Sequence, residues 1–478
     1  MNIRVRFAPS PTGFLHIGGL RTALFNYIYA KKTGGKIVLR IEDTDQSRKV
    51  DGAVENLINT FGKIGIEFDE GPTQGGEYGP YFQSQRLDIY QDHIAKLIES
   101  GDAYYCFCPP KRLEFLRNEL TEKKLTIKYD RHCLNLSTEE IEKQKNSEPY
   151  VIRMKIPDVD EIVFYDGVRD KVSIKCNEID DQVLIKGDGF PTYHFANVVD
   201  DHLMGITHIM RGEEWLPSTP KHVLLFQFFG WKSPKYFHLP LLLNPDKSKL
   251  SKRQGDVAVE DYLNNGFLPE ALVNYVALLG WHSSSDRELF SMNELVKEFS
   301  VKRLQKAGAV FDIEKLKWMN SHYLMNLDIK SIANYSKSWF EKAGFNLTDN
   351  SKYLAVVENT RKRVNQIPEM VDHARPFYSE LQFNEDNLIV LNESSAQIVF
   401  EFILKNLNSK GNWTEEELKS LIRETSEETG VKGKNLFFPL RLALFGSPHG
   451  PEIPLIIQTL GIDETIKRIQ NQLFFTKP

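Results

Sequence analysis

The first residues whose types and spacing suit chemistry lie between Phe7 and Gly19, in the stretch F-A-P-S-P-T-G-F-L-H-I-G-G. Two prolines and two small hydroxyl residues end a short alternation of apolar and basic residues, and a helical pattern begins at Gly18. Hydroxyl groups, an imidazole and the backbone N–H groups of a helix N-terminus are donors suited to phosphate. Taken alone, the stretch fits a nucleotide site and an ordinary strand-to-helix loop equally well.

A second polar stretch, D-K-S-K-L-S-K-R-Q-G-D, spans residues 246–256 and follows the apolar run from His238 to Leu243. By itself, this lysine-rich loop is typical of a solvated surface. The two stretches together resemble the two signatures of class I aminoacyl-tRNA synthetases. The forms R-F-A-P-S-P-T-G, R-I-E-D-T-D and K-L-S-K-R are similar to those of glutamyl-tRNA synthetases of the bacterial type.

The resemblance runs almost from end to end of the chain. It includes the stretches from Gly187 to His202, from Arg211 to Trp215 and from Phe311 to Asn320. Gly19 stands where most members of the class have a second histidine, and glycine is usual there in this family. His16 is therefore the only imidazole of the first signature.

Activation of an amino acid by ATP is an in-line displacement at the α-phosphorus, so the protein mainly positions reactants and stabilises phosphate charge. The resemblance implies that His16 donates to a phosphate and that Lys252 brings charge to the triphosphate. Lys249 and Ser251 would hold the loop of Lys252 closed, and Mg²⁺ would arrive with ATP. Without the second signature, a helix cap or a core position would be the better interpretation of His16. The implied ATP site comprises Pro9, Ser10, Thr12, Gly13, His16, Gly18, Gly19 and Lys252.

Selection of glutamate needs a cation for the side-chain carboxylate and an anion for the α-ammonium. Arg6 lies on the first expected strand and Arg211 ends the apolar run 205–210, so both are expected to point into the crevice. The resemblance implies that these two arginines face the substrate carboxylates. A bidentate arginine would reject the amide isostere without an editing domain. The implied glutamate site comprises Arg6, Ala8, Ser10, Glu42, Tyr193, Asn197 and Arg211.

The alternative for such charged residues at strand ends is an ion pair between them. Arg40 with Asp43 is one example, and for Asp43 and Asp45 we prefer this structural interpretation.

The elements that position these residues begin with one β-loop-α-β unit. The expected strands are 3–7 and 36–41, with a helix between them that stops at Gly34 and Gly35. Helices are expected over 47–65, with Asp45 or Ser47 as the cap, and over 86–100. Residues 109–148 are polar, with a capping-box pattern from Ser137 to Glu140, and residues 150–185 alternate like strands. A crossover helix is expected over 216–229, and helical patterns dominate from Pro269 onward.

These patterns predict an α/β protein. The patterns predict an insertion of α+β type and an all-α C-terminal half, and the resemblance implies that the α/β part is a Rossmann-like class I synthetase catalytic domain. The catalytic domain is expected over 1–108 and 187–240, and a connective insertion that binds the tRNA acceptor end over 109–186. A stem-contact domain with the lysine-rich loop is expected over 241–324, and a helical anticodon-binding region over 325–478.

Composition sets limits on these interpretations. The chain has 478 residues, 41% of them apolar, with no 18-residue apolar run and no signal-like start, so we expect a soluble, cytoplasmic protein. The formal charge is −5, so tRNA binding must rely on local basic patches. The candidates are Lys302, Arg303, Lys306, Lys315 and Lys317 in one stretch and Arg361, Lys362 and Arg363 in another. For any single patch taken alone, a solvated helix face is the preferred interpretation. The resemblance implies that Arg363 meets an anticodon base.

Four cysteines in this length suit a reducing compartment rather than a disulfide framework. Some relatives bind structural zinc with Cys-x-Cys followed by Cys-x-His. Here Asn135 occupies the expected histidine position after Cys133, although His132 could join Cys106, Cys108 and Cys133 by ligand type. We therefore predict no structural zinc, and expect Cys176 to be a buried apolar residue.

The predicted function is ATP-dependent attachment of L-glutamate to tRNA(Glu) through glutamyl-adenylate, which releases AMP and diphosphate. The expected partners are tRNA(Glu) and L-glutamate, with no membrane, and a monomer is usual for the family. Two alternatives stay open: an enzyme that also charges tRNA(Gln), and a catalytically silent relative that binds nucleotide and tRNA. The helical pattern of residues 325–478 argues against a glutaminyl-tRNA synthetase, whose C-terminal half is rich in strands.

Overall fold

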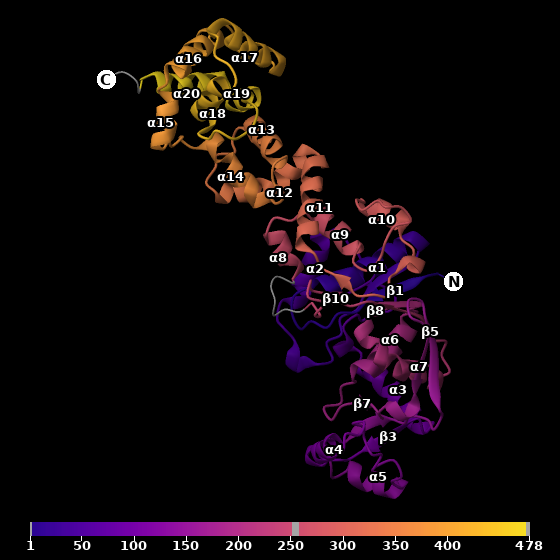
Figure 1. The fold of residues 1–478 in the computed structure, drawn as a ribbon. Helices are drawn as coiled ribbons and strands as arrows, with labels where there is room; N and C mark the ends of the chain where they lie inside the picture. Colours follow the sequence, from indigo (N-terminus) through magenta and orange to yellow (C-terminus); the bar gives the residue numbers. More distant parts are fainter. Residues whose placement is uncertain (1, 251–257, 475–478) are drawn as a thin grey trace. The chain divides into compact units, whose positions relative to one another are not determined.

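The computed structural model describes residues 2–250 and 258–474, and the chain divides into two compact units. The first unit comprises residues 1–264 and 269–313, and the second comprises 265–268 and 314–478. Sheets and helices alternate in the first unit, whereas every described element of the second unit is a helix (Figure 1). The predicted order, an α/β part followed by an all-α part, is confirmed.

The expected β-loop-α-β unit is present at the start of the chain. Strand β1 (Arg4–Phe7) pairs in parallel with β2 (Lys36–Leu39), and helix α1 (Ile17–Thr33) connects them. The helix stops at Gly34, which adopts a left-handed conformation (φ 64°) that a residue without a Cβ reaches at little cost. Loop residues 8–16 therefore lie between the end of a parallel strand and the N-terminus of a helix.

A four-stranded sheet in the order β6-β5-β9-β8 lies next to this unit. Strands β8 (His208–Gly212) and β9 (Lys235–Leu239) are parallel, and their register places Arg211 opposite His238. The antiparallel hairpin of β5 (Glu161–Asp166) and β6 (Asp170–Lys175) joins β9 at a single pair, Asp166 with Tyr236. Strand β8 lies beside β1, because the Thr207 N–H donates to the Arg4 carbonyl at 2.9 Å.

Helices α6 (Tyr193–Leu203) and α7 (Thr219–Phe228) pack near this sheet (Figure 1). Their apolar faces join the strands in one core, which includes Phe195, Val198, Ile209 and Leu225. The 3-10 turn η4 (Glu213–Ser218) precedes α7, so the predicted crossover helix 216–229 is shorter than expected. Pro217 and Pro220 place the start of the regular helix at Thr219, because proline is tolerated in a first helical turn but not later.

The helix predicted over 47–65 also differs. It consists of a 3-10 turn η1 (Gln46–Arg48) and helix α2 (Ala53–Lys63), with Gly52 in a left-handed conformation at the N-cap. The predicted caps, Asp45 and Ser47, do not cap α2, because the Asp45 carboxylate is bonded to the Ser47 hydroxyl and the Arg48 guanidinium.

A three-stranded antiparallel sheet in the order β3-β4-β7 forms the centre of the segment predicted as an insertion. Its strands are β3 (Ala103–Cys106), β4 (Val151–Met154) and β7 (Val183–Ile185). Helix α4 (Pro110–Glu122) buries none of its side chains, and α5 (Thr138–Lys145) begins with the expected capping box of Ser137 and Glu140.

The other elements of the first unit are short. They are η2 (Gln83–Gln85), α3 (Leu87–Glu99), η3 (Cys176–Glu178), the parallel pair β10 (Leu242–Leu243) and β11 (Ala309–Val310), α8 (Val259–Asn264), α9 (Pro269–Ala277), α10 (Met292–Glu298) and η6 (Val301–Arg303).

Ten helices make up the described part of the C-terminal region. They are α11 (Ile313–Asn326), α12 (Ile329–Lys342), α13 (Asn350–Arg361), α14 (Ile367–Tyr378), α15 (Glu385–Leu391), α16 (Ser394–Leu407), α17 (Glu415–Thr429), α18 (Lys434–Phe445), α19 (Ile453–Leu460) and α20 (Ile462–Phe474). Asp328, Asp349, Asn384 and Thr414 accept backbone N–H groups at helix starts. In the described residues, no single helix is long and apolar enough to cross a membrane; only the bent pair α15 and α16 passes by length and composition.

Gly167 fastens the β5–β6 hairpin to β9, and its lack of a side chain is required there. Its N–H donates to the Tyr236 carbonyl at 2.8 Å, and a Cβ would lie 2.1 Å from the buried Phe237 ring. We expect Gly167→Ala to lower the free energy of unfolding by about 1–3 kcal/mol, because the packed ring must move. Gly62→Ala is the matched control: nothing lies within 4 Å of its Cβ position in α2, and it should raise stability by about 0.5–1 kcal/mol. Urea denaturation measures both, and equal effects would contradict the packing argument.

Candidate functional site

The first signature stretch lies beside the start of α8 and beside Lys249 and Leu250, which belong to the described part of the second signature. The Val259 N–H donates to the Leu15 carbonyl at 2.8 Å, and His16 forms an isolated antiparallel bridge with Ala258. A pocket of about 310 Å³ opens at the start of α1, and both stretches line it. Its lining includes His16, Ile17, Gly18, Gly19, Gly212, Lys249 and Leu250.

The N-terminus of α1 gives this pocket a positive character. His16 is the N-cap, its backbone is extended, and its side chain does not cap the helix. All of α1 is described, and its first turn contains no acidic residue. The first N–H groups of the helix and its dipole are therefore directed at the pocket, an arrangement that suits phosphate, and Arg21 and Lys249 line the same pocket together with one carboxylate, Glu214.

A second pocket of about 130 Å³ adjoins the first and shares His16 and Gly19 with it. Its lining includes Pro9, Ser10, Thr12, Gly13, His16 and Gly19. Seven of the residues expected to hold ATP therefore surround two adjoining pockets, with Gly18 in the first. Lys249 lines the first pocket, whereas Ser251 and Lys252 lie outside the described residues.

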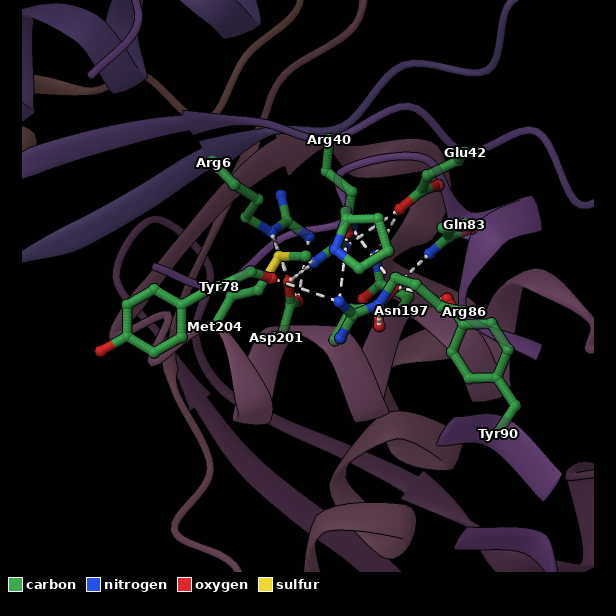
Figure 2. Close-up of polar contacts among 12 residues, drawn as sticks. Arg6, Arg40, Glu42, Tyr78, Gln83, Arg86, Tyr90, Asn197, Asp201 and Met204 are labelled. Carbon is green, nitrogen blue, oxygen red and sulfur yellow. Dashed lines mark hydrogen bonds and ion pairs between the residues drawn. The ribbon is translucent and has the colours of Figure 1, made fainter. Parts of the chain in front are cut away.

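A buried cluster of charges lies beyond the ends of β1 and β2 (Figure 2). Asp201 accepts from the Arg6 Nε at 3.1 Å and from the Arg40 Nη1 at 2.8 Å. Glu42 accepts from the Arg40 Nη2 and from the Asn197 Nδ2, both at 3.1 Å. Burial raises the pKa of Glu42 in spite of the two nearby arginines. Arg6, Glu42 and Asn197, three residues of the expected glutamate site, are thus brought together.

A second buried carboxylate, Asp200, completes this cluster. It accepts from the Arg86 Nε at 2.7 Å, the Gln83 Nε2 at 2.8 Å and the Tyr90 hydroxyl at 2.7 Å. Three arginines therefore face three carboxylates: Arg6, Arg40 and Arg86 against Glu42, Asp200 and Asp201. Charges at this depth persist only when they are paired and hydrogen-bonded.

The expected ion pair between Arg40 and Asp43 is wrong. The Asp43 carboxylate accepts instead from the Ser84 N–H at 2.8 Å and from its hydroxyl at 2.7 Å. The structural interpretation holds for Asp45, which pairs with Arg48 at 2.6 Å. Sequence reasoning also missed Arg86, Gln83, Tyr90, Asp200 and Asp201. The signal that could have found the two aspartates was V-V-D-D-H, a pair of acids inside an apolar helical pattern.

Arg211 at the end of β8 has a different environment, because its partners in residues 2–250 and 258–474 are uncharged. Its Nη1 donates to the Tyr193 hydroxyl and to the His222 Nδ1, both at 3.1 Å. Its Nη2 donates to the Thr219 hydroxyl at 2.9 Å, and its Nε donates to the His238 Nε2 at 3.1 Å. Burial and the nearby Arg211 lower the pKa of His222, and burial lowers the pKa of His238, so both imidazoles are neutral at pH 7.

The Arg211 guanidinium is 4% exposed, and within the described part of the chain no carboxylate pairs with it. An arginine remains charged under all ordinary conditions, so this buried cation lacks a protein counter-charge. Among the buried arginines described above, Arg211 is therefore the one beside which an anionic ligand would be most strongly stabilised.

Helix α6 connects the surroundings of Arg211 with the cluster of three arginines and three carboxylates. Tyr193 and Asn197 lie one turn apart on the same face, and they contact Arg211 and Glu42 respectively. Burial raises the pKa of Tyr193, on which the charges of Arg211, Glu42, Arg6 and Asp201 also act. Of the remaining expected residues, Ala8 is half-buried and Ser10 is exposed in the loop after β1. The site thus presents a carboxylate suited to an ammonium and a guanidinium suited to a carboxylate.

Three of the four cysteines, two just before the predicted insertion and one within it, also converge. The Cys106, Cys108 and Cys133 sulfurs lie within 4.8 Å of one another. The Tyr129 hydroxyl donates to or accepts from them, at 3.4 Å from Cys106 and 3.2 Å from Cys108. His132 is exposed and is not part of this group. Burial raises the pKa of Cys108 to about 12, so its thiol is protonated. Cys176 is buried as expected, at the start of η3.

Most members of the expected basic patches are engaged within the protein. Arg361 donates to the Leu324 and Leu327 carbonyls and pairs with Glu358, which also pairs with Lys362. In the other patch, Lys306 pairs with Asp170, Lys317 pairs with Glu314, and Arg303 donates to the Glu298 carbonyl.

Arg363 differs from its neighbours: it is exposed, and no ion pair involves it among the described residues. Burial lowers the pKa of Arg441, and the Arg363 charge lowers it further, so two cations lie near each other on the helical unit.

Comparison with known proteins places the chain in a family. Residues 2–318 match the family described as tRNA synthetases class I (E and Q), catalytic domain, and residues 328–473 match an anticodon binding domain. The chain therefore belongs to the class I tRNA synthetases of the E and Q type, as the signatures predicted. Membership implies the use of ATP, and the anticodon binding domain supports tRNA binding.

Similar proteins indicate which amino acid this class I synthetase is related to. The chain is similar to the glutamate–tRNA ligases of Clostridioides difficile (strain 630), with 47% identity, and Alkaliphilus metalliredigens (strain QYMF), with 46% identity. Each alignment covers 98% of this chain and 98% of the relative. The fold matches the glutamate tRNA ligase of Elizabethkingia meningosepticum CCUG26117, solved in complex with its amino acid. The identity is 37%, the TM-score is 0.91, and both chains are covered completely. The resemblance to glutamyl-tRNA synthetases and the class I synthetase fold are therefore confirmed.

The cysteine cluster generates a prediction about metal. Its fourth position is a phenol rather than the imidazole or fourth thiolate that zinc usually takes, so the absence of structural zinc stays a prediction. Purified protein should contain less than about 0.2 equivalents of zinc, and a chelator should leave its melting temperature unchanged. Mass spectrometry measures the zinc content, and thermal melts with and without the chelator measure the effect on stability. Near-stoichiometric zinc would show that three thiolates and Tyr129 suffice.

Proposed function

We propose that this chain attaches L-glutamate to tRNA(Glu) in an ATP-dependent reaction. The observation that carries the proposal is the buried Arg211 cation, whose partners among the described residues are all neutral and which contacts the same face of α6 as the Glu42 carboxylate. Such a pair suits an amino acid with a second carboxylate. The similarity over 98% of the chain to glutamate–tRNA ligases supports the same substrate.

ATP binds at the start of α1. The first N–H groups of the helix, together with His16, hold the phosphates in the pocket of about 310 Å³. Lys249 lies at the rim of this pocket, and Lys252 and Ser251 act from the same loop, with Lys252 as the charge that stabilises the transition state. Mg²⁺ accompanies the triphosphate. An oxygen of the substrate α-carboxylate attacks the α-phosphorus, and diphosphate leaves.

The glutamate carboxylates contact Arg211 and Arg6, and the α-ammonium contacts Glu42. Arg211 is the stronger determinant, because Asp201 already neutralises Arg6. Glutamine would place a neutral amide against Arg211 and leave the buried charge unpaired, so it is rejected. Tyr193 and Asn197 fix the positions of Arg211 and Glu42, and Ser10 and Ala8 complete the pocket.

The terminal ribose hydroxyl of the tRNA then attacks the acyl carbon of glutamyl-adenylate, and AMP leaves. Residues 109–186 bind the acceptor end, residues 241–324 contact the stem, and residues 325–478 read the anticodon with Arg363 among the contacts. The protein acts as a monomer in the cytoplasm. Charging of tRNA(Gln) is a separate activity, which aminoacylation of purified tRNA(Gln) measures directly.

The decisive experiment for the amino acid replaces Arg211. Arg211→Gln should raise the Michaelis constant for glutamate about thirtyfold, because a buried charge-assisted pair is worth about 2 kcal/mol. The Michaelis constant for ATP should change little. ATP–pyrophosphate exchange with tRNA(Glu) present measures both. Arg287→Gln, an exposed arginine paired with Glu294, is the matched control. An unchanged constant for glutamate would remove Arg211 from the site, and an equal loss for both substrates would indicate misfolding.

A second experiment concerns tRNA recognition by the helical unit. Arg363→Gln should raise the Michaelis constant for tRNA(Glu) about fivefold or more and reduce its salt dependence, with no change for ATP or glutamate. Arg375→Gln, an exposed arginine that pairs with Asp372 on the same unit, is the matched control. Aminoacylation at several salt concentrations gives these values. Identical behaviour of the two variants would count against the assignment of Arg363.

A further inference from the structure

A buried carboxylate outside the expected site is connected to Arg211 through a single histidine. Asp166 ends strand β5 and His238 lies on the neighbouring strand β9, directly opposite Arg211 on β8. Both Asp166 and His238 are almost completely buried. The three side chains form one line of hydrogen bonds across three adjacent strands, and sequence analysis assigned no role to Asp166 or His238.

The Asp166 carboxylate is fixed at both oxygens. Its Oδ1 accepts from the backbone N–H groups of Val168 at 2.9 Å and Arg169 at 2.8 Å. Its Oδ2 accepts from the His238 Nδ1 at 2.7 Å. Burial opposes ionisation, but these donors outweigh it and hold the pKa of Asp166 below its usual range. Asp166 is therefore ionised at neutral pH and can only accept hydrogen bonds.

This arrangement determines the tautomer of His238. Because Asp166 can only accept, the Nδ1 of the neutral imidazole must carry the proton, and the Nε2 must carry a lone pair. That lone pair accepts the Arg211 Nε–H at 3.1 Å. The opposite tautomer would direct an N–H at the guanidinium, which has no acceptor. His222, the other imidazole on Arg211, has no such anchor, because its second nitrogen contacts the neutral His194 at 3.0 Å.

We propose that Asp166 is a positioning residue for amino-acid recognition, because it sets the His238 tautomer that orients the Arg211 guanidinium toward the substrate carboxylate. The inference rests on the proposed role of Arg211. It also gives the β5–β6 hairpin a function: the segment predicted as an insertion supplies a buried group that organises the glutamate site.

Asp166→Asn tests this with almost no change in shape. The Val168 and Arg169 N–H groups at Oδ1 require the amide oxygen on that side, so the amide NH₂ must face the His238 Nδ1, and the bond that Oδ2 accepts from the His238 backbone N–H at 3.2 Å is lost as well. The NH₂ group donates, so the proton moves to Nε2 and the contact with Arg211 is lost. We expect the Michaelis constant for glutamate to rise about tenfold or more, as for the loss of a hydrogen bond to a charged group, with the constant for ATP unchanged.

The His238 tautomer can be measured directly, and it would not change if Asp166 had only a structural role. In protein labelled with ¹⁵N-histidine, the His238 Nε2 signal should change from the unprotonated to the protonated position in Asp166→Asn. The signal is assigned by its loss in His238→Gln. Asp170→Asn is the matched control, because Asp170 lies on the same hairpin, is exposed, and pairs only at the surface with Lys306. Asparagine also tolerates its positive φ of 63°. This control should match the unchanged protein in all measurements.

A double-mutant cycle completes the test. If Asp166 acts through the imidazole, Asp166→Asn should add little to the glutamate defect of His238→Gln. The proposal is overturned if the two defects multiply, if the tautomer signal stays in place, or if the constants for ATP and glutamate rise together. Failure of the proposed function looks different: Arg211→Gln would then leave glutamate use unchanged. A defective Arg211→Gln with a normal Asp166→Asn would refute the role of Asp166 alone.

Discussion

The pairing of buried charge is the constraint on which the rest of the site depends. Arg6, Arg40 and Arg86 are almost inaccessible to solvent, and each meets a carboxylate at 3.1 Å or less. Removing one partner would leave an uncompensated charge in the interior, which usually costs about 3–5 kcal/mol. Since these three arginines are all paired, Arg211 is an exception: no carboxylate lies beside it in the described residues.

The fold brings these charges together because parallel strands end at one edge. Strands β1, β2 and β8 supply Arg6, Arg40 and Arg211 near their carboxyl ends, and the start of α6 faces that edge. Residues one turn apart on α6 then contact different partners: Asn197 donates to Glu42, and Asp201 accepts from two arginines. Ligand sites outside the carboxyl ends of the strands are the general arrangement of open α/β sheets. Here, the loop that follows β1 also leads to the N-terminus of α1 and to the pocket of about 310 Å³ at its start.

The local parts of this arrangement could be predicted from the sequence. The first strand, the loop at Pro9 and the helix that stops at Gly34 follow from hydrophobic period and from glycine and proline, which act within a few residues. The capping box at Ser137 was predicted for the same reason. The start of α2 was not, because Gly52 and the side-chain bonds of Asp45 displaced the expected cap.

Partners that lie far apart along the chain could not be predicted in this way. Arg40 was paired with Asp43, a neighbour along the chain, yet its shortest contact is with Asp201, 161 residues away. Hydrophobic period carries no information on which charges meet across such a distance. Asp166 was missed for a related reason: it ends an ordinary alternating strand, and only the register of β5 with β9 brings it to His238. The resemblance to a known family supplied Arg211 and Tyr193, but no pattern within one sequence joins them.

The neutral partners of Arg211 have a physical consequence for selectivity. A carboxylate in place of His222 or His238 would stabilise the empty protein, but it would also compete with the substrate for the same guanidinium. Imidazoles, a phenol and a hydroxyl satisfy the N–H groups of Arg211 and leave its charge available. Under the proposed role of Arg211, a ligand that brings the missing counter-charge would stabilise the folded state by mass action. An amide cannot supply that charge, so this electrostatic imbalance would discriminate between glutamate and glutamine.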